Sequence, residues 1–347
     1  MQETSCMTLF SLAICRRERL KIRNAGAGRD IDCTEAIFMA IVPTDVPMTS
    51  ALCDRTIAEL LNRYPFCRSE TLTTTAFGNP VRTLVIGEGP RRVLYTAAHH
   101  ANEWITTPVI LKFVEAFAQA IASDGEIFGI SARRLAEKAA IYTVPMVNPD
   151  GVDLVTGAYP PGKLPYETAR ALAASYPTIA FPDGWKANLL GVDLNLNYPA
   201  GWLRAREIKF SQGYTRPGPR DYVGRFPLDQ VESRALAGYT EYIQPELVLA
   251  FHSQGEVIYW QFADYYVPGA RDLGELFSRL SGYALEDTPY ASSFAGYKDW
   301  FIQEFRKPGY TIEVGLGENP LPISQFDTIY RSCLGILVTA AYGGELL

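Results

Sequence analysis

All three histidines of this 347-residue chain follow or end short apolar runs that favour β-strands. His99 and His100 come directly after the run at 93–98, and His252 ends the run at 247–252. A helical pattern of apolar residues follows the first pair, so the local order is strand, polar turn and helix. In open α/β sheets, ligands bind in the crevice at the carboxyl ends of the strands. We therefore expect the histidines at one edge of one sheet.

Strand-like and helix-like patterns alternate along the rest of the chain. Strands are expected at 81–86, 140–147, 257–260 and 310–314, and helices at 49–64, 104–122, 228–243, 273–285, 297–305 and 329–342. Stretches rich in Pro and Gly at 157–185 and 203–228 are interpreted as loops. This alternation, clear from about Asp45, predicts one α/β domain with a mixed, mostly parallel twisted sheet and helices on both faces.

Composition limits the kinds of partner. The net charge is -6 and hydrophobic residues make up 48% of the chain, which supplies a core and argues against nucleic acid or an anionic membrane as partner. No apolar run approaches bilayer length, so no transmembrane segment is predicted. Residues 1–40 carry a short apolar run followed by arginines, the reverse of a secretory signal. We expect a cytoplasmic rather than a secreted protein, with residues 1–40 as a disordered extension or a misassigned start.

His100, Glu103 and His252 form a candidate set of metal ligands. Zinc in a catalytic site takes three protein ligands of the His and Glu/Asp types and keeps a fourth position open for water. The chain has no HExxH helix, which excludes the thermolysin arrangement. A histidine after a strand is often an ordinary turn residue, but the three residues together predict a site for one Zn²⁺.

Glu313 is a carboxylate in an apolar, strand-like run between Ile312 and Val314. Burying a lone carboxylate is costly, so this group must be paired, protonated or functional. Beside a metal-bound water, a carboxylate can take a proton and pass it to a leaving amine, which is the chemistry of amide hydrolysis. A structural salt bridge with an Arg or Lys is the alternative.

The segment 185–199 places polar side chains between apolar ones, and its Asn, Gly and Pro residues argue against a regular element. Its Asp193, Asn195 and Asn197 are equally consistent with substrate contacts and with ordinary turn hydrogen bonds. The pattern alone does not choose between these two interpretations.

Taken together, the chain resembles the zinc carboxypeptidase family in four ordered motifs: His100-Ala-Asn-Glu103, Gly191-Val-Asp-Leu-Asn195, His252 at a strand end, and Thr-Ile-Glu313-Val-Gly. The similarity covers roughly residues 42–345 and implies a zinc carboxypeptidase-like fold. It implies that His100, Glu103 and His252 bind zinc, and that Glu313 is the general base and acid. Asp193 would hydrogen-bond to His100 and orient it, as metal-bound imidazoles require.

Longer stretches are similar to one branch of this family, the γ-D-glutamyl-L-diamino-acid endopeptidases. They include His-His-Ala-Asn-Glu-Trp-Ile-Thr-Thr-Pro at 99–108, Trp-Lys-Ala-Asn at 185–188, His-Ser-Gln-Gly-Glu-Val-Ile-Tyr-Trp at 252–260 and Gly-Leu-Gly-Glu-Asn-Pro-Leu-Pro at 315–322. The resemblance implies hydrolysis of the γ-D-glutamyl to meso-diaminopimelate bond in a peptidoglycan stem peptide or muropeptide. Relatives often carry LysM wall-binding repeats, and none is visible in this sequence.

The chain departs from ordinary carboxypeptidases at two positions. Leu196 stands where they have an arginine that binds the substrate's terminal carboxylate through two hydrogen bonds, and leucine cannot do so. Lys186 stands in the place of a second arginine, which polarises the scissile carbonyl, and it keeps the charge. The resemblance also implies substrate contacts from Asn195, Gln254 and Tyr290, the last being the nearest candidate for the family's mobile tyrosine.

Three functions therefore stay open. The first is the zinc-dependent peptidase acting on peptidoglycan-derived peptides. The second is a zinc carboxypeptidase or amide deacylase of another specificity, which a panel of peptides and N-acyl amino acids would distinguish. The third is a non-catalytic muropeptide-binding relative, which failure to bind metal would favour.

Overall fold

The computed structural model describes residues 40–343, and those from Ile41 onward form one compact unit. The expected N-terminal extension, residues 1–40, lies outside the described residues except for Ala40. The main sheet has seven strands in the order β10-β9-β11-β8-β4-β7-β3. Their bounds are β3 (Leu84–Ile86), β4 (Arg91–Ala97), β7 (Ala139–Val144), β8 (Leu247–His252), β9 (Val257–Tyr259), β10 (Ala284–Glu286) and β11 (Gly309–Glu313).

The sheet is mixed and mostly parallel, as predicted. Strands β11, β8, β4 and β7 run parallel to one another. At one end β3 is antiparallel to β7, and at the other β9 is antiparallel to β11 and parallel to β10. Two small antiparallel pairs stand apart from it, formed by β1 (Thr71–Thr74) with β2 (Pro80–Arg82) and by β5 (Glu126–Ile127) with β6 (Ile130–Ser131).

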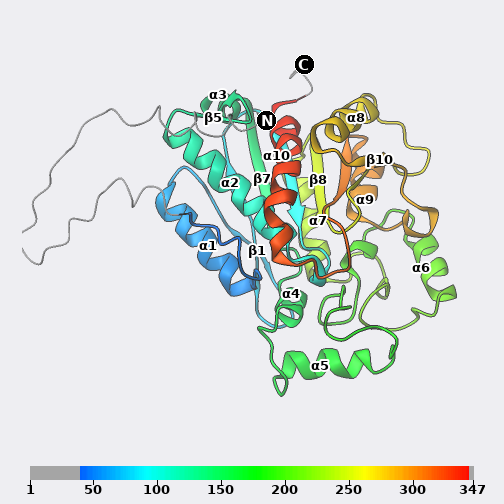
Figure 1. Ribbon diagram of the computed structural model, residues 1–347. Helices are drawn as coiled ribbons and strands as arrows, with labels where there is room; N and C mark the ends of the chain where they lie inside the picture. The colour runs from blue at the N-terminus through cyan, green and yellow to red at the C-terminus, as the bar shows by residue number, and fades with distance from the viewer. Residues whose placement is uncertain (1–39, 344–347) are drawn as a thin grey trace, which may run out of the picture. The chain divides into compact units, whose positions relative to one another are not determined.

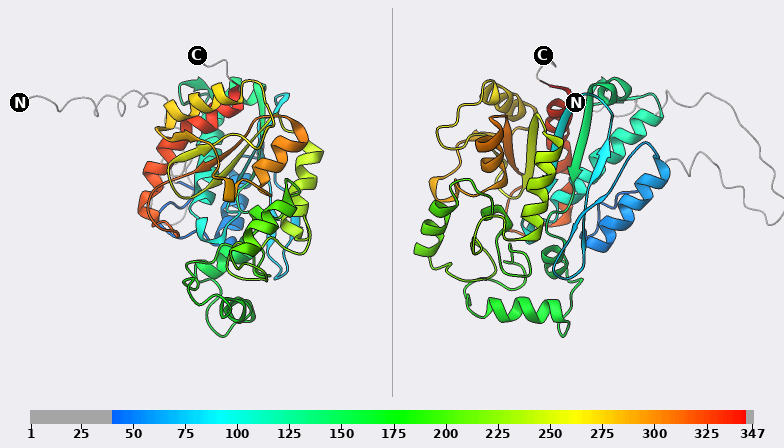
Figure 2. Two further views of the ribbon diagram at one scale, coloured as in Figure 1. Left: turned by 90° about the vertical axis from the view of Figure 1, so that its right-hand side faces the viewer. Right: turned by 180° about the vertical axis from the view of Figure 1, so that it is seen from behind.

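Helices cover both faces of the main sheet (Figures 1 and 2). One face shares a hydrophobic cluster with α1 (Ser50–Arg63), α2 (Thr106–Ala122), α3 (Ala132–Lys138), α8 (Ala270–Ser281) and α10 (Phe326–Tyr342). The other face packs with α7 (Val231–Ile243) and α9 (Tyr297–Phe305). Three further helices lie in the segments that connect these elements: α4 (Pro149–Val155), α5 (Leu164–Ala173) and α6 (Trp202–Ser211). The predicted α/β domain with helices on both faces is confirmed.

Strand β8 shows why the central strands are continuous apolar runs in the sequence. Its Leu247, Leu249 and Phe251 pack into the cluster on the α10 side of the sheet. Val248 and Ala250 pack into the cluster on the α7 side. Successive side chains of a strand point to opposite faces, and here both faces are covered. Every position of the strand is therefore buried, and no polar alternation marks it.

The prediction of loops at 157–185 and 203–228 was wrong over α5 and α6. Helix α5 buries only Ala169 and Ala173, and the Pro and Gly residues around it led to the prediction of a loop despite its amphipathic pattern. Helix α6 buries Trp202, Ala205 and Lys209, and one of these three is charged. Both helices lie away from the main sheet (Figure 1). Of the two, only α6 lacks a clear periodic pattern of apolar residues.

Two element boundaries also differ from the prediction. The strand expected at 140–147 is β7, which ends at Val144, and α4 begins directly after Asn148, whose side chain accepts a hydrogen bond from Gly151 N at 3.1 Å. The helix expected at 273–285 spans Ala270–Ser281 and stops at Gly282, whose φ is 82°. A left-handed glycine is a common helix terminator, and β10 follows it.

Segment 101–122, which contains α2, is long and apolar enough to cross a membrane, the one such helical segment among residues 40–343. The segment is not an uninterrupted apolar run, because it contains Glu103, Lys112 and Glu115. Of its most apolar 18-residue window, 72% is buried inside the protein. Phe113, Val114 and Phe117 belong to the cluster that packs on the sheet, so the apolar length is that of a core helix.

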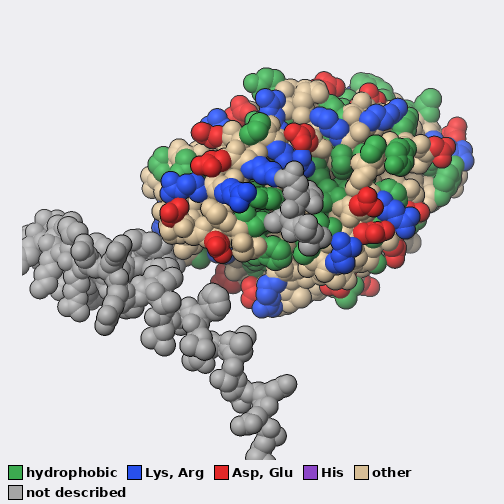
Figure 3. Space-filling view, turned by 90° about the horizontal axis from the view of Figure 1, so that it is seen from above, with side chains coloured by type: hydrophobic (Ala, Val, Ile, Leu, Met, Phe, Trp, Pro, Cys, Tyr) green, Lys and Arg blue, Asp and Glu red, His purple; other side chains and the backbone are tan. Residues whose placement is uncertain are grey.

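On the face in Figure 3, basic and acidic side chains are interspersed.

The carboxyl ends of three neighbouring strands bring the predicted residues together. His252 ends β8, Glu313 ends β11, and these two residues are direct register partners. Ala97 of β4 pairs with Phe251 of β8, so His100 leaves the sheet beside His252. The expected gathering at one edge of one sheet is confirmed.

Candidate metal centre

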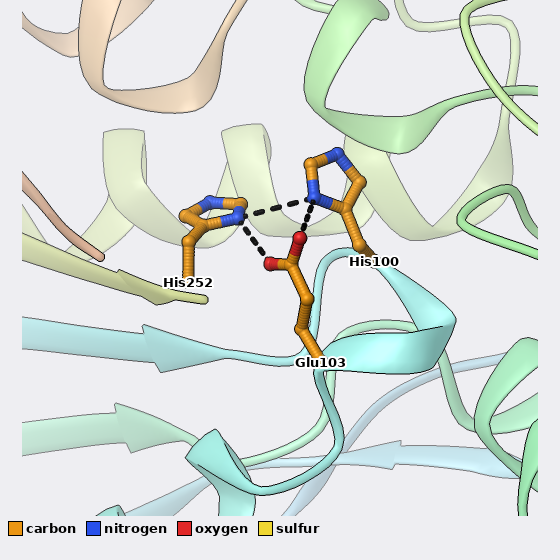
Figure 4. A group of neighbouring side chains, drawn as sticks. All are labelled: His100, Glu103 and His252. Carbon is orange, nitrogen blue, oxygen red and sulfur yellow. Dashed lines mark hydrogen bonds and ion pairs between the residues drawn. The ribbon is translucent and has the colours of Figure 1, made fainter. Parts of the chain in front are cut away.

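His100, Glu103 and His252 converge on one point at this edge (Figure 4). Nδ1 of His100 lies 2.9 Å from Oε1 of Glu103, and Nδ1 of His252 lies 2.9 Å from Oε2. The two Nδ1 atoms are 3.3 Å apart, and the three ligand atoms all lie within 4.8 Å of one another. A tetrahedral zinc with bonds of about 2.0–2.1 Å spaces its ligands by about 3.3 Å. The donor set therefore fits zinc in both chemistry and spacing.

The turn after β4 is held by its own backbone and by one threonine. Thr106 Oγ1 accepts a hydrogen bond from Ala98 N at 3.0 Å and donates one to Glu103 O at 2.7 Å. Ala101 N donates to the carbonyl oxygen of Lys186 at 3.0 Å, which ties the turn to the following loop. These bonds fix the short helical turn Ala101–Glu103, so that His100 and Glu103 point to the same side.

The two imidazoles differ in charge because they are so close. Burial opposes protonation of both rings, but the carboxylates of Glu103 and Asp193 raise the pKa of His100 to about 9. Burial lowers the pKa of His252, and the positive charge on His100 lowers it further. The site thus favours one positive charge between the two rings and Glu103, which is where a metal cation would sit.

Asp193 holds the far side of the His100 ring. Its Oδ1 lies 3.1 Å from His100 Nε2 and accepts a hydrogen bond from Asn195 N at 3.2 Å. Its Oδ2 accepts one from Asp221 N at 3.2 Å. Burial opposes its charge, but the neighbouring His100 holds the pKa of Asp193 below its usual value. A carboxylate on the second nitrogen of a metal-bound imidazole orients the ring, the role the resemblance implied for Asp193.

Glu313 faces the same cavity as His100, a hollow of about 240 Å³. No hydrogen bond or ion pair joins its carboxylate to another residue in the range 40–343. The alternative of a structural salt bridge therefore has no partner in this part of the chain. Burial raises the pKa of Glu313 to about 8, and the nearby Glu103 charge adds to the rise. A carboxyl group with such a pKa can both accept and return a proton near neutral pH.

Lys186 lines the cavity beside the three ligands. Its Nζ lies 3.0 Å from Glu103 Oε1, and its side chain is 20% exposed. Burial opposes its charge, but the Glu103 carboxylate outweighs this and the pKa of Lys186 is raised. A positive charge therefore stands next to Glu103, and the role that the resemblance implies for Lys186 in catalysis stays a prediction.

The three predicted substrate contacts fall in different places. Asn195 lines the cavity, and its Oδ1 accepts a hydrogen bond from Tyr297 N at 3.0 Å. Tyr290 is 61% exposed, its hydroxyl accepts from Arg204 Nε at 3.0 Å, and it does not line the cavity. Gln254 is exposed in the bend after β8 and also lies outside the lining. The structure brings Asn195 to the site and leaves Tyr290 and Gln254 outside the cavity, so their substrate roles stay predictions.

Sequence reasoning missed a group of charged residues that line the same cavity. They are Lys209, Arg220, Asp221, Lys298 and Asp299. Asp221 pairs with Lys209 and with Arg220, each at 2.6 Å, in the region interpreted as a featureless loop. Lys298 and Asp299 lie in a helix that was predicted correctly. Adjacent charged residues at the start of this helix were the one available signal, and periodicity alone does not say that they face a cavity.

Known proteins carry the same fold and sequence pattern. The zinc carboxypeptidase family pattern matches residues 53–333. A curated relative, gamma-D-glutamyl-L-diamino acid endopeptidase 1 of Lysinibacillus sphaericus, is 44% identical over 82% of this chain and 70% of its own length. The uncharacterized protein YqgT of Bacillus subtilis (strain 168) is 36% identical over 84% of this chain and 76% of its own.

A solved structure shows the fold at lower identity. The carboxypeptidase A of Helicoverpa armigera is 18% identical and superposes with a TM-score of 0.66, covering 87% of this chain and 75% of that one. The family match spans most of the described unit and includes all three ligands and Glu313. This chain belongs to the zinc carboxypeptidase family and is a zinc metallopeptidase.

Proposed function

We propose that this chain hydrolyses the amide bond between a γ-D-glutamyl residue and meso-diaminopimelate in peptidoglycan-derived peptides. The relative that is 44% identical carries the name gamma-D-glutamyl-L-diamino acid endopeptidase, and meso-diaminopimelate is a diamino acid with an L centre. The single observation that carries the chemistry is one cavity that joins His100, Lys186, Asp193 and Glu313. Metal ligand, cation, orienting carboxylate and base all face the same 240 Å³ of space.

His100, Glu103 and His252 hold the zinc in this proposal. Zinc so bound supplies a water of lowered pKa and polarises the substrate carbonyl. Asp193 keeps the His100 ring in place through its 3.1 Å contact with Nε2. Lys186 places a positive charge beside the carbonyl oxygen, where negative charge develops as the carbonyl is attacked.

Glu313 moves the proton. Its carboxylate takes a proton from the attacking water, whose oxygen forms the new bond to the carbonyl carbon. The same proton then goes to the amide nitrogen as the C–N bond breaks, and the diamino acid leaves as a free amine. The carboxylate is free for both steps because no other described residue holds it in a hydrogen bond.

Leu196 disfavours an ordinary carboxypeptidase. It lines the cavity and is 8% exposed, and its side chain has no donor for a terminal carboxylate. A zinc carboxypeptidase or amide deacylase of other specificity remains the competing function, and a substrate panel tests it directly.

The deciding experiment incubates the purified, zinc-loaded protein with L-Ala-γ-D-Glu-meso-diaminopimelate. We expect free meso-diaminopimelate and L-Ala-D-Glu, identified by mass, and loss of both products after treatment with a chelator. The panel adds peptides with single C-terminal amino acids and N-acyl amino acids. Faster hydrolysis of any of these than of the γ-D-glutamyl peptide would contradict the proposal.

A further inference from the structure

A second pair of opposite charges faces the catalytic cavity. Lys298 and Asp299 lie in the first turn of α9 and are 4% and 3% exposed. Both line the cavity that His100 and Glu313 also line. Lys298 Nζ lies 2.5 Å from Asp299 Oδ1. Burying two charges is costly even when they pair. A buried ion pair on the wall of a ligand cavity therefore points to a role in binding the ligand.

Each partner has at least one weak contact inside the protein. An ammonium has three donors, and Lys298 Nζ donates to Gln261 O at 2.6 Å but reaches Thr288 Oγ1 only at 3.5 Å. Asp299 Oδ1 is buried and, within residues 40–343, accepts no hydrogen bond of good geometry despite its closeness to Lys298. Thr288 is the most distant of the three partners of Lys298 Nζ, and it also lines the cavity, so a charged acceptor in the cavity would replace this contact.

The position of Asp299 in the helix gives only part of the reason. A carboxylate in the first turn is stabilised by the helix dipole. The same dipole disfavours a buried lysine at the preceding position. The helix alone thus does not account for the buried Lys298, whereas a ligand with both charges would bind the two groups together.

We propose that Lys298 and Asp299 determine specificity by binding the far end of the diamino acid, where an ammonium and a carboxylate share one carbon. This inference rests on the proposed function, since the other amine of the diamino acid is in the scissile bond. The ligand ammonium donates to the Asp299 carboxylate, and the ligand carboxylate accepts from Lys298 Nζ. meso-Diaminopimelate offers both groups, and lysine offers only the ammonium.

The cavity has the size for this assignment. Its 240 Å³ is below the roughly 300–1,000 Å³ of sites for drug-sized ligands, so it suits about one residue of a peptide. Charged hydrogen bonds contribute enough that losing one lowers kcat/KM roughly 10- to 100-fold. A zwitterionic end should therefore be selected strongly over an end with one charge.

The test uses three substrates, L-Ala-γ-D-Glu-X, in which X is meso-diaminopimelate, L-lysine or 2-aminopimelate. These end in both charges, the ammonium alone and the carboxylate alone. We expect the wild type to prefer diaminopimelate over each of the others by roughly 10- to 100-fold in kcat/KM. Lys298→Met should remove most of the preference over lysine, and Asp299→Asn most of the preference over 2-aminopimelate. Lys163→Met, at an exposed lysine, is the matched control and should keep both preferences.

Each preference is a ratio measured within one preparation, so partial misfolding of a variant cancels. Lys298→Arg keeps the charge and should retain the preference over lysine better than Lys298→Met does. Equal kcat/KM for the three substrates in the wild type, or unchanged ratios in Lys298→Met, would overturn this inference and leave the proposed function standing. Failure of the wild type to cleave any of the three would overturn both.

Discussion

Charged groups stand at two places around the cavity: the metal end, formed by His100, Glu103 and His252, and the far end, formed by Lys298 and Asp299. These two ends hold their charges in opposite ways. At the metal end, the donor atoms of His100, Glu103 and His252 lie within 4.8 Å of one another and converge on one point. At the far end, Lys298 and Asp299 already neutralise each other across 2.5 Å. The first arrangement attracts a cation, because one carboxylate and two imidazoles face the same space. The second arrangement has no net charge and favours a ligand that carries both signs.

The metal end therefore serves catalysis, and the far end serves the choice of substrate. The metal end rests on the ends of three paired strands, where the sheet fixes each backbone position. The far end rests on the first turn of α9, outside the sheet. A rigid sheet edge gives the precision that catalysis needs, and the helix end adds specificity without disturbing it. Substitutions at one end should therefore leave the property of the other end intact.

The largest effect is expected from loss of a metal ligand. His252→Ala removes one of three donors, so the protein should lose its zinc, and hydrolysis should fall to background. Zinc content by atomic absorption and product by mass are the measurements. Lys298→Met is the comparison at the far end and should keep one zinc per chain. Retention of stoichiometric zinc by His252→Ala would break the assignment of the metal end.

The next effect is expected at the general base. Glu313→Gln keeps the shape of the side chain and cannot accept the proton, so kcat should fall by roughly 10²–10⁴-fold. Zinc content should stay at one per chain, because Glu313 is not among the three ligands. Glu318→Gln, at an exposed carboxylate five residues along the chain, is the matched control. A kcat for Glu313→Gln close to that of the control would exclude Glu313 as the base.

The metal end could be predicted from the sequence because strands carry it. A chain with three histidines, each at the end of an apolar run, leaves few ways to arrange them in a parallel sheet. Glu313 was found for the same reason, as a charge inside a buried strand. The resemblance added Asp193 and Lys186, which stand on loops; for Asp193, spacing alone had left two equal interpretations.

The far end could not be predicted, because no periodic pattern positions it. Lys298 and Asp299 follow each other in a helix, and their direction depends on how α9 packs against the sheet. Arg220 and Asp221 lie in a stretch without regular structure, and Asp221 has a positive φ of 64°. Tyr290 was inferred from chain spacing to a family tyrosine, and it lies on the surface beside Arg204 instead of in the cavity.

A smaller effect on the metal end is expected from Asp193→Asn. The amide keeps an oxygen near His100 Nε2 and loses the charge that orients the ring, so zinc affinity should fall roughly 10- to 100-fold. Competition with a chromophoric chelator measures this affinity. Asp183→Asn, at an exposed aspartate in the same loop region, should bind zinc like the wild type. Equal affinities in the two variants would show that Asp193 does not support the ligand.

The smallest effect is expected at Glu232, a buried carboxylate that belongs to neither end. It is 2% exposed, and Asn188 Nδ2 approaches its Oε1 at 3.4 Å. Asn188 in turn accepts hydrogen bonds from Leu190 N and Val192 N, so it shapes the turn that leads to Asp193. Burial raises the pKa of Glu232 from 4.5 to about 7. The folded protein therefore binds this proton more tightly than the unfolded chain does.

This pKa shift fixes how the stability of Glu232→Gln depends on pH. As pH rises from 4.5 to 7, the unfolded wild type loses the proton first, so its free energy of unfolding falls, and above pH 7 the loss is complete. Glutamine does not ionise, so the free energy of unfolding of the variant does not fall in this way. The variant should be more stable than the wild type by about 1–3 kcal/mol above pH 7, and the gain should shrink toward pH 4.5. Urea unfolding at pH 5 and pH 8 measures it. A difference that is the same at both pH values would mean that Glu232 is ionised in the folded protein, and zinc content should be unaffected in either case.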